Sequence, residues 1–187
     1  MTAVAPIIKP AGISAMAADS SATILDTLDG AVVLAGAGKM GGAMLTGWLA
    51  RGLAAGRVAV IEPKPSPDIH ALVARGLKLN PAPGQVGAIS AIVIAVKPQI
   101  FAEEAAALRA FVRPDGLVVS IMAGRTIAGI AAACGGAVVR AMPNMPASIG
   151  RGMTVAAAAA NVTVAQRAIA DALLAATGAV EWIADEA

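Results

Sequence analysis

The chain has 187 residues, of which 58% are hydrophobic and 14% charged, so it is long enough for one domain with a large core. Its 14 basic and 12 acidic residues are dispersed, and its only aromatic residues are two Trp and two Phe, which argues against a nucleic-acid partner. A single His and a single Cys exclude the usual metal sites and an internal disulfide, so a bound cofactor must supply the chemistry.

The first thirty residues are expected to form a flexible leader, because Ala, Pro and Ser follow one another there without a sustained period. They lack the charged start and the apolar segment of a signal peptide. No apolar stretch approaches the roughly 20 residues that cross a bilayer. A single cysteine fits a reducing compartment, so we expect a cytoplasmic protein without a membrane partner. Residues 31–187 are expected to form one domain.

From residue 31 onward, short apolar runs alternate with helical patterns. We expect strands at 31–35, 58–61, 91–96, 117–121, 138–141, 153–157 and 180–183. We expect helices at 39–53, 69–75, 100–111, 126–134 and 163–176. The alanine run at 156–160 favours helix by propensity, but it follows a strand-like Met153-Thr154-Val155. This alternation, with strands apolar on both faces, predicts an α/β fold of the Rossmann type: a doubly wound, mostly parallel sheet with helices on both faces.

A G-x-G-x-x-G sequence, from Gly36 to Gly41, lies between the first expected strand and the first expected helix. In this motif the glycines allow a tight turn, close approach of the backbone to a pyrophosphate and close helix packing, and the helix N-terminus favours an anion. Glu62 ends the next strand, 21 residues after Gly41, where a carboxylate binds ribose hydroxyls. The pattern predicts a site for NAD or NADP. A glycine-rich turn that binds nothing and a ligand-sensing module are the alternatives here.

Four segments in a fixed order resemble the N-terminal domain of pyrroline-5-carboxylate reductase. They are Gly36 to Trp48 (GAGKMGGAMLTGW), Ala95 to Gln99 (AVKPQ), Val119 to Gly124 (VSIMAG) and Arg140 to Pro146 (RAMPNMP). The resemblance covers about Val32 to Ala187. It implies the NAD(P)H-dependent reduction of the cyclic imine (S)-1-pyrroline-5-carboxylate to L-proline, the last step of proline biosynthesis.

Members of that family continue into a helical domain that forms the dimer and carries the substrate loop. This C-terminal domain is expected beyond Ala187, so we expect the chain alone to be inactive. The resemblance implies that the full-length protein is a homodimer or a higher homo-oligomer.

The resemblance also implies roles for individual residues, none of them catalytic. The residues at the coenzyme's pyrophosphate are Ala35, Gly36, Ala37, Gly38, Lys39 and Met40, to which the glycine motif adds Gly41. Ser66 lies at the adenosine ribose, where the motif also places Glu62. The residues on the nicotinamide side are Ala95, Val96, Lys97, Pro98 and Ala123, and Asn144 lies at the mouth of the site. Glu186 matches a position that faces the substrate. A protonated imine already accepts hydride, so the site mainly has to position the reactants and exclude water.

Several interpretations remain open at this point. Another imine or 2-hydroxyacid reductase would have the same glycine motif, and so would a stand-alone NAD(P)-binding regulatory module. Lys97 is explained almost as well by a structural role at a strand end. His70 is expected to be a solvated helix residue and Cys134 a small buried apolar group. Coenzyme choice is open, because Glu62 repels a 2′-phosphate whereas Lys64 and Ser66 are able to receive one.

Overall fold

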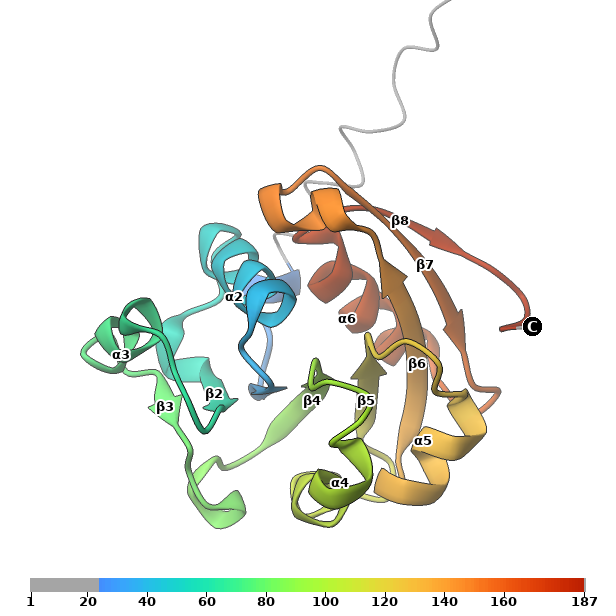
Figure 1. Cartoon of the computed structure of the whole chain (residues 1–187), viewed down its shortest axis with the longest axis horizontal. Coiled ribbons are helices and arrows are strands. Elements are labelled where there is room, and N and C mark those ends of the chain that lie inside the picture. Colours follow the sequence, from blue (N-terminus) through green and yellow to red (C-terminus); the bar gives the residue numbers. More distant parts are fainter. Residues whose placement is uncertain (1–23, 187) are drawn as a thin grey trace, which may run out of the picture.

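A computed structural model describes residues 24–186, which form one eight-stranded sheet and the helices that cover it (Figure 1). The strands are β1 (Ala31–Ala35), β2 (Val58–Ile61), β3 (Lys78–Leu79), β4 (Ile89–Ile94), β5 (Leu117–Ser120), β6 (Ala137–Pro143), β7 (Gly152–Ala158) and β8 (Gly178–Trp182). The helices are α2 (Lys39–Ala50), α3 (Pro67–Val73), α4 (Phe101–Arg109), α5 (Ile127–Cys134) and α6 (Val164–Ala175), with a short 3-10 helix η3 (Met145–Ile149) between β6 and β7.

The strand order across the sheet is β3-β2-β1-β4-β5-β6-β7-β8. Neighbouring strands are parallel except for β6 and β7, which run antiparallel. The direction of winding reverses between β1 and β4, and ligands bind beyond the carboxyl ends of the strands at such a switch point. The expected Rossmann-type, mostly parallel sheet is confirmed.

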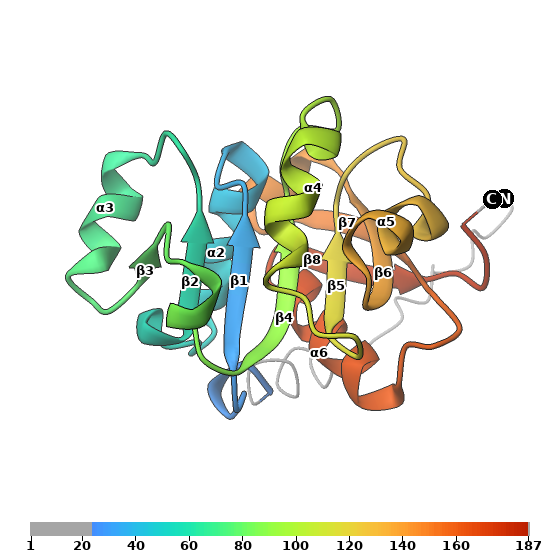
Figure 2. The same ribbon diagram turned by 90° about the horizontal axis from the view of Figure 1, so that it is seen from below.

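The helices cover both faces of the sheet, as expected. Figure 2 shows α4 and α5 on one face and α6 on the other. Two groups of buried side chains correspond to these faces, one packed against α2, α3 and α6 and the other against α4 and α5. Val32 and Leu34 of β1 point into the first group and Val33 into the second, because side chains alternate along a strand. Within residues 24–186, no helix is long and apolar enough to cross a membrane.

Helix α2 packs closely on helix α6. The Trp48 side chain is fully buried, and its indole N–H donates a hydrogen bond of 2.8 Å to the carbonyl of Leu173. A Cβ atom added to Gly47 would lie 2.5 Å from the carbonyl oxygen of Ala176. The two helices therefore touch through backbone at this point, which fixes the position of α2 against the sheet.

The structure corrects the expected boundaries at several places. Residues 1–23 of the expected leader lie outside the described residues, but the rest of it is packed: Leu25 and Leu28 belong to the core under α2. The described domain therefore begins before residue 31. Strand β3 was not predicted, because two residues carry no periodicity. Helix α2 ends at Ala50 rather than Leu53, just before Gly52 with its positive φ of 99°.

Replacing Leu25 by alanine tests whether this N-terminal segment belongs to the folded domain. Leu25 is fully buried, so we expect the substitution to lower the free energy of unfolding by about 2–5 kcal/mol through lost apolar contacts and the cavity left behind. Denaturant unfolding measures this difference. Val164→Ala is the matched control, since Val164 is 89% exposed and should change stability by less than about 0.5 kcal/mol. Equal effects of the two substitutions would contradict the packing of Leu25.

Candidate dinucleotide-binding site

Two glycines of the loop between β1 and α2 are needed by the fold itself. Gly36 has a φ of 87°, which side chains rarely adopt, and a Cβ there would lie 2.7 Å from the carbonyl oxygen of Ala95. A Cβ on Gly41 would collide with the carbonyl oxygen of Gly36. These glycines let the chain turn sharply at the end of β1 and let α2 start against the neighbouring strand.

Gly38 differs from these two glycines, because nothing in the fold requires it. Its φ is −67°, which any residue adopts, and a Cβ added to it would meet no atom within 4 Å. The space over Gly38 lies at the start of α2, whose first turn has no side-chain cap and no acidic residue. The N–H groups of a first turn favour an anion, so this opening fits the phosphates of a dinucleotide.

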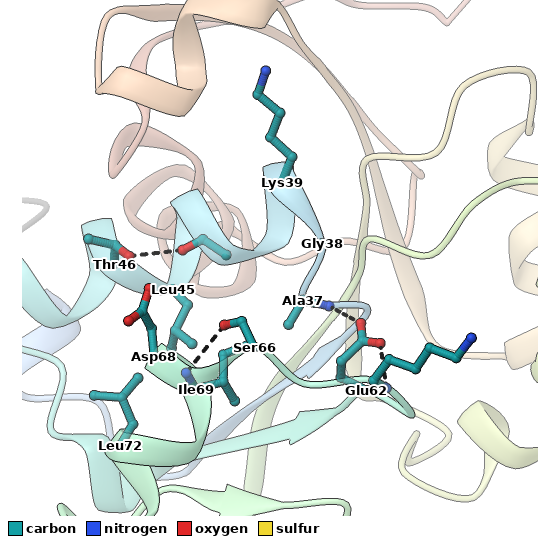
Figure 3. Close-up of a pocket in the computed structure, with 12 residues that line it drawn as sticks. Ala37, Gly38, Lys39, Leu45, Thr46, Glu62, Ser66, Asp68, Ile69 and Leu72 are labelled. Carbon is teal, nitrogen blue, oxygen red and sulfur yellow. Dashed lines mark hydrogen bonds between the residues drawn. The ribbon is translucent and has the colours of Figure 1, made fainter.

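Glu62 reaches from the end of β2 to the same loop (Figure 3). One oxygen of its carboxylate accepts a hydrogen bond of 2.9 Å from the backbone N–H of Ala37, and the other accepts one of 3.0 Å from the backbone N–H of Lys64. The carboxylate therefore stands beside Gly38 with both oxygens held. A carboxylate in this position of a Rossmann fold is a ribose ligand.

A cavity of about 470 Å³ opens between the start of α2, the end of β2 and helix α3. Figure 3 shows Gly38, Lys39, Glu62 and Ser66 around it. Its lining comprises Ala37, Gly38, Lys39, Gly42, Leu45, Thr46, Glu62, Lys64, Ser66, Asp68, Ile69 and Leu72. Ser66 also caps α3, where its hydroxyl accepts a hydrogen bond from the N–H of Ile69 at 3.4 Å. The size and the mixed polar and apolar lining suit part of a nucleotide.

Residues expected on the nicotinamide side lie outside this cavity, on two neighbouring loops at the carboxyl edge of the sheet. Residues 95–98 directly follow β4, and Ala123 follows β5. Arg125 ties the two loops together, because its guanidinium donates a hydrogen bond of 2.6 Å to the carbonyl of Pro98. Lys97 is exposed. No sequence pattern marks Arg125, since an arginine in a loop is ordinary.

Asn144 and Glu186 are held by contacts of their own. The Asn144 carboxamide accepts a hydrogen bond of 3.0 Å from the N–H of Met153, which closes the connection from β6 to β7. Both carboxylate oxygens of Glu186 accept from the N–H of Ile127 at the start of α5, and one lies 3.4 Å from the Arg140 guanidinium. Neither residue lines the cavity, so their expected roles stay predictions.

No sequence motif predicted a role for Asn80, although its side chain contacts Glu62 in the site. Its side chain accepts a hydrogen bond from the N–H of Glu62 at 2.8 Å and donates one to the carbonyl of Glu62 at 2.9 Å. The dipeptide Asn80-Pro81 is a turn signal and marks where β3 ends. It does not reveal which residue the side chain contacts.

Other reactive side chains take no part in this site. His70 is exposed on α3, and Cys134 is the buried last residue of α5, as expected. Burial raises the pKa of the Cys134 thiol, and the charge of Arg109 opposes that rise. Within the described residues there is no group of His, Cys, Asp or Glu that could hold a metal ion.

Comparisons with known proteins agree with this geometry. A family model described as NADP oxidoreductase, coenzyme F420-dependent, matches residues 31–124. A pyrroline-5-carboxylate reductase of Pseudomonas aeruginosa is 32% identical over 161 residues, which are 83% of this chain and 58% of that protein. The chain thus spans less than two thirds of this relative.

Two solved structures have the same fold. A pyrroline-5-carboxylate reductase from Coxiella burnetii superimposes with a TM-score of 0.75 at 26% identity, over 84% of this chain and 60% of that one. A Plasmodium falciparum pyrroline carboxylate reductase, solved with NADP bound, gives 0.67 at 21% identity, over 83% of this chain and 58% of that one. The expected resemblance is confirmed.

Proposed function

The chain belongs to the family of coenzyme F420-dependent NADP oxidoreductases, and we propose that it is the coenzyme-binding part of a pyrroline-5-carboxylate reductase. The reaction is the NAD(P)H-dependent reduction of a cyclic imine to L-proline. The observation that carries the proposal is the open space over Gly38 beside a fixed carboxylate, Glu62. The identity of the substrate is inferred from the similarity to curated reductases.

The residues present fit a nicotinamide dinucleotide. Gly38 and the first turn of α2 hold the phosphates, and Glu62 and Ser66 hold the adenosine ribose in the cavity toward α3. Residues 95–98 and Ala123 form the wall on the nicotinamide side. When bound, the reduced coenzyme supplies the hydride for the imine carbon.

The chain has to position the reactants and needs no nucleophile for this reaction, because a protonated imine is electrophilic already. Arg125 keeps the loops after β4 and β5 at a fixed separation through its bond to Pro98, which shapes the wall on which the ring rests. Rigid loops reduce the entropy lost on reaching the near-attack geometry. Lys97, exposed on the first of these loops, either contacts the coenzyme or stabilises loop carbonyls.

The wall of the site that holds the substrate corresponds to the part of the relatives that this chain does not match. An apolar face supports this: Met142 of β6 and Met153 and Val155 of β7 are about two-fifths to one-half exposed, and Met145 and Ile149 of η3 are more so. Exposed apolar patches of this kind mark interaction surfaces.

The proposal also includes assembly of the full-length protein into a homo-oligomer and a location in the cytoplasm. The cytoplasmic location agrees with the single, buried Cys134, which forms no disulfide.

Glu62→Ala tests the assignment of the ribose site. The substitution removes a negative charge that would face a 2′-phosphate and an acceptor for the 2′-hydroxyl. We expect the ratio of the NADPH to the NADH dissociation constant to fall by about tenfold. Calorimetric or fluorescence titration of the purified chain with each coenzyme measures that ratio.

The matched control is Glu104→Ala, the same chemical change at an exposed position of α4, remote from the cavity. It should leave both dissociation constants unchanged. An unchanged ratio in Glu62→Ala would show that the carboxylate does not read the ribose. A wild-type chain that binds neither coenzyme would contradict the proposed function itself.

A further inference from the structure

Strand β3 stops short beside the end of β2. Its last ladder contact is made by Asn80, whose backbone N–H donates a hydrogen bond of 2.7 Å to the carbonyl of Val60. There the main chain turns away with a φ of 48°. Asn80 is the only residue other than glycine with a positive φ in the described part of the chain. Asn tolerates this region better than most residues, and backbone strain of this kind gathers at functional sites.

The side chain of Asn80 extends the hydrogen bonding with the β2 segment by one residue beyond the point where the main chain turns away. Its oxygen accepts from the N–H of Glu62 at 2.8 Å, and its amide nitrogen donates to the carbonyl of Glu62 at 2.9 Å. A carboxamide offers one acceptor and a donor as a peptide group does. Asn80 therefore pairs with Glu62 in place of a further residue of β3.

Glu62 is consequently held at both ends. Asn80 fixes its main chain, and the N–H groups of Ala37 and Lys64 fix the two oxygens of its carboxylate. Glu62 is partly exposed and lines the cavity beside Gly38. An acceptor fixed before binding loses less entropy when a ligand arrives, and it cannot turn aside to relieve repulsion from a negative group.

We propose that Asn80 is a positioning residue for coenzyme choice: it holds Glu62 so that the carboxylate accepts from the free hydroxyls of the adenosine ribose and disfavours a 2′-phosphate. This inference rests on the proposed function, because it needs a dinucleotide in the cavity. Asn80 itself acts only through Glu62.

Asn80→Gly is the primary variant, because glycine keeps the turn at positive φ while both side-chain hydrogen bonds are lost. We expect the NADH dissociation constant to rise about three- to tenfold, as for the loss of one or two hydrogen bonds, with less than about a twofold change for NADPH. Asn80→Ala is the second variant. It also removes both side-chain hydrogen bonds without adding a charge, so it should shift the ratio in the same direction.

A double-mutant cycle tests whether Asn80 acts through Glu62. In the Glu62→Ala background, Asn80→Gly should leave the ratio of the two dissociation constants unchanged. Thermal unfolding of each variant, with and without coenzyme, confirms that the folded protein is being titrated.

The outcomes separate the two proposals. An equal loss of affinity for both coenzymes, or the same shift with Glu62 already removed, overturns the role of Asn80 and leaves the dinucleotide site standing. A ratio unchanged in both Asn80 variants does the same. Absence of binding by the wild-type chain overturns both proposals together.

Discussion

Replacing Gly38 by valine is expected to weaken dinucleotide binding at least about a hundredfold while the chain still folds. The reason is the open space over Gly38, where an added Cβ meets no protein atom and would instead occupy the volume proposed for the phosphates. The backbone conformation at Gly38 is also one that valine adopts, so no strain is introduced. Titration with NADH and with NADPH measures the loss, and circular dichroism with thermal unfolding checks the fold.

Gly41→Ala is the contrasting variant within the same motif. Its Cβ would collide with the carbonyl oxygen of Gly36, so we expect a destabilised chain rather than a folded one that has lost its ligand. Gly38→Ala should fall between wild type and valine in affinity, with little change in stability. Undiminished affinity in a folded Gly38→Val chain would contradict the placement of the phosphates.

The 187-residue chain, assayed by itself, is expected to bind coenzyme but to show no measurable reduction of pyrroline-5-carboxylate. The coenzyme loops form one wall, and hydride transfer needs the imine held about 3–3.5 Å from the donor carbon and shielded from water. The chain spans 58% of the Pseudomonas relative, and the apolar face of β6 and β7 is uncovered. A steady-state assay that follows NAD(P)H oxidation decides the matter.

Two controls make this assay informative. Titration of the same sample with coenzyme shows that the site is competent, and the Pseudomonas relative serves as the active reference. Turnover by the 187-residue chain comparable to the reference would mean that this domain holds a complete active site. The proposed division of labour would then be wrong.

The sequence predicted the order of helices and long strands because the helices bury a periodic apolar face and most of the strands are short, continuous apolar runs. The alanine-rich β7 is an instructive case: helix propensity opposed the strand, and pairing with β6 on one side and β8 on the other overrode it. Tertiary contacts also decided the N-terminal boundary. Leu25 is one apolar residue without a pattern around it, and only the core that it enters makes it part of the domain.

The residues of the candidate site also fall into two groups, those that the sequence predicted and those that it did not. The glycine motif and Glu62 were predictable, because the spacing of such residues reflects a turn and a strand end that are local in sequence. Asn80 and Arg125 were not, since no motif or spacing rule connects either residue with its partner, Glu62 or Pro98. Nor does the motif alone distinguish Gly38, which faces open space, from Gly36 and Gly41, which the backbone needs.

The contact between α2 and α6 has a consequence for local unfolding. Helix α2 begins at the glycine loop, and Trp48 farther along it is bonded to Leu173 of α6. Opening α6 therefore disturbs the element that carries the first-turn amides. A ligand on those amides raises the free energy of every partial unfolding that releases it, in proportion to the logarithm of its concentration. We therefore expect the amide protons of α6 and of the loop to gain protection from exchange together when a ligand binds, although the bonded pair is 125 positions apart in the sequence.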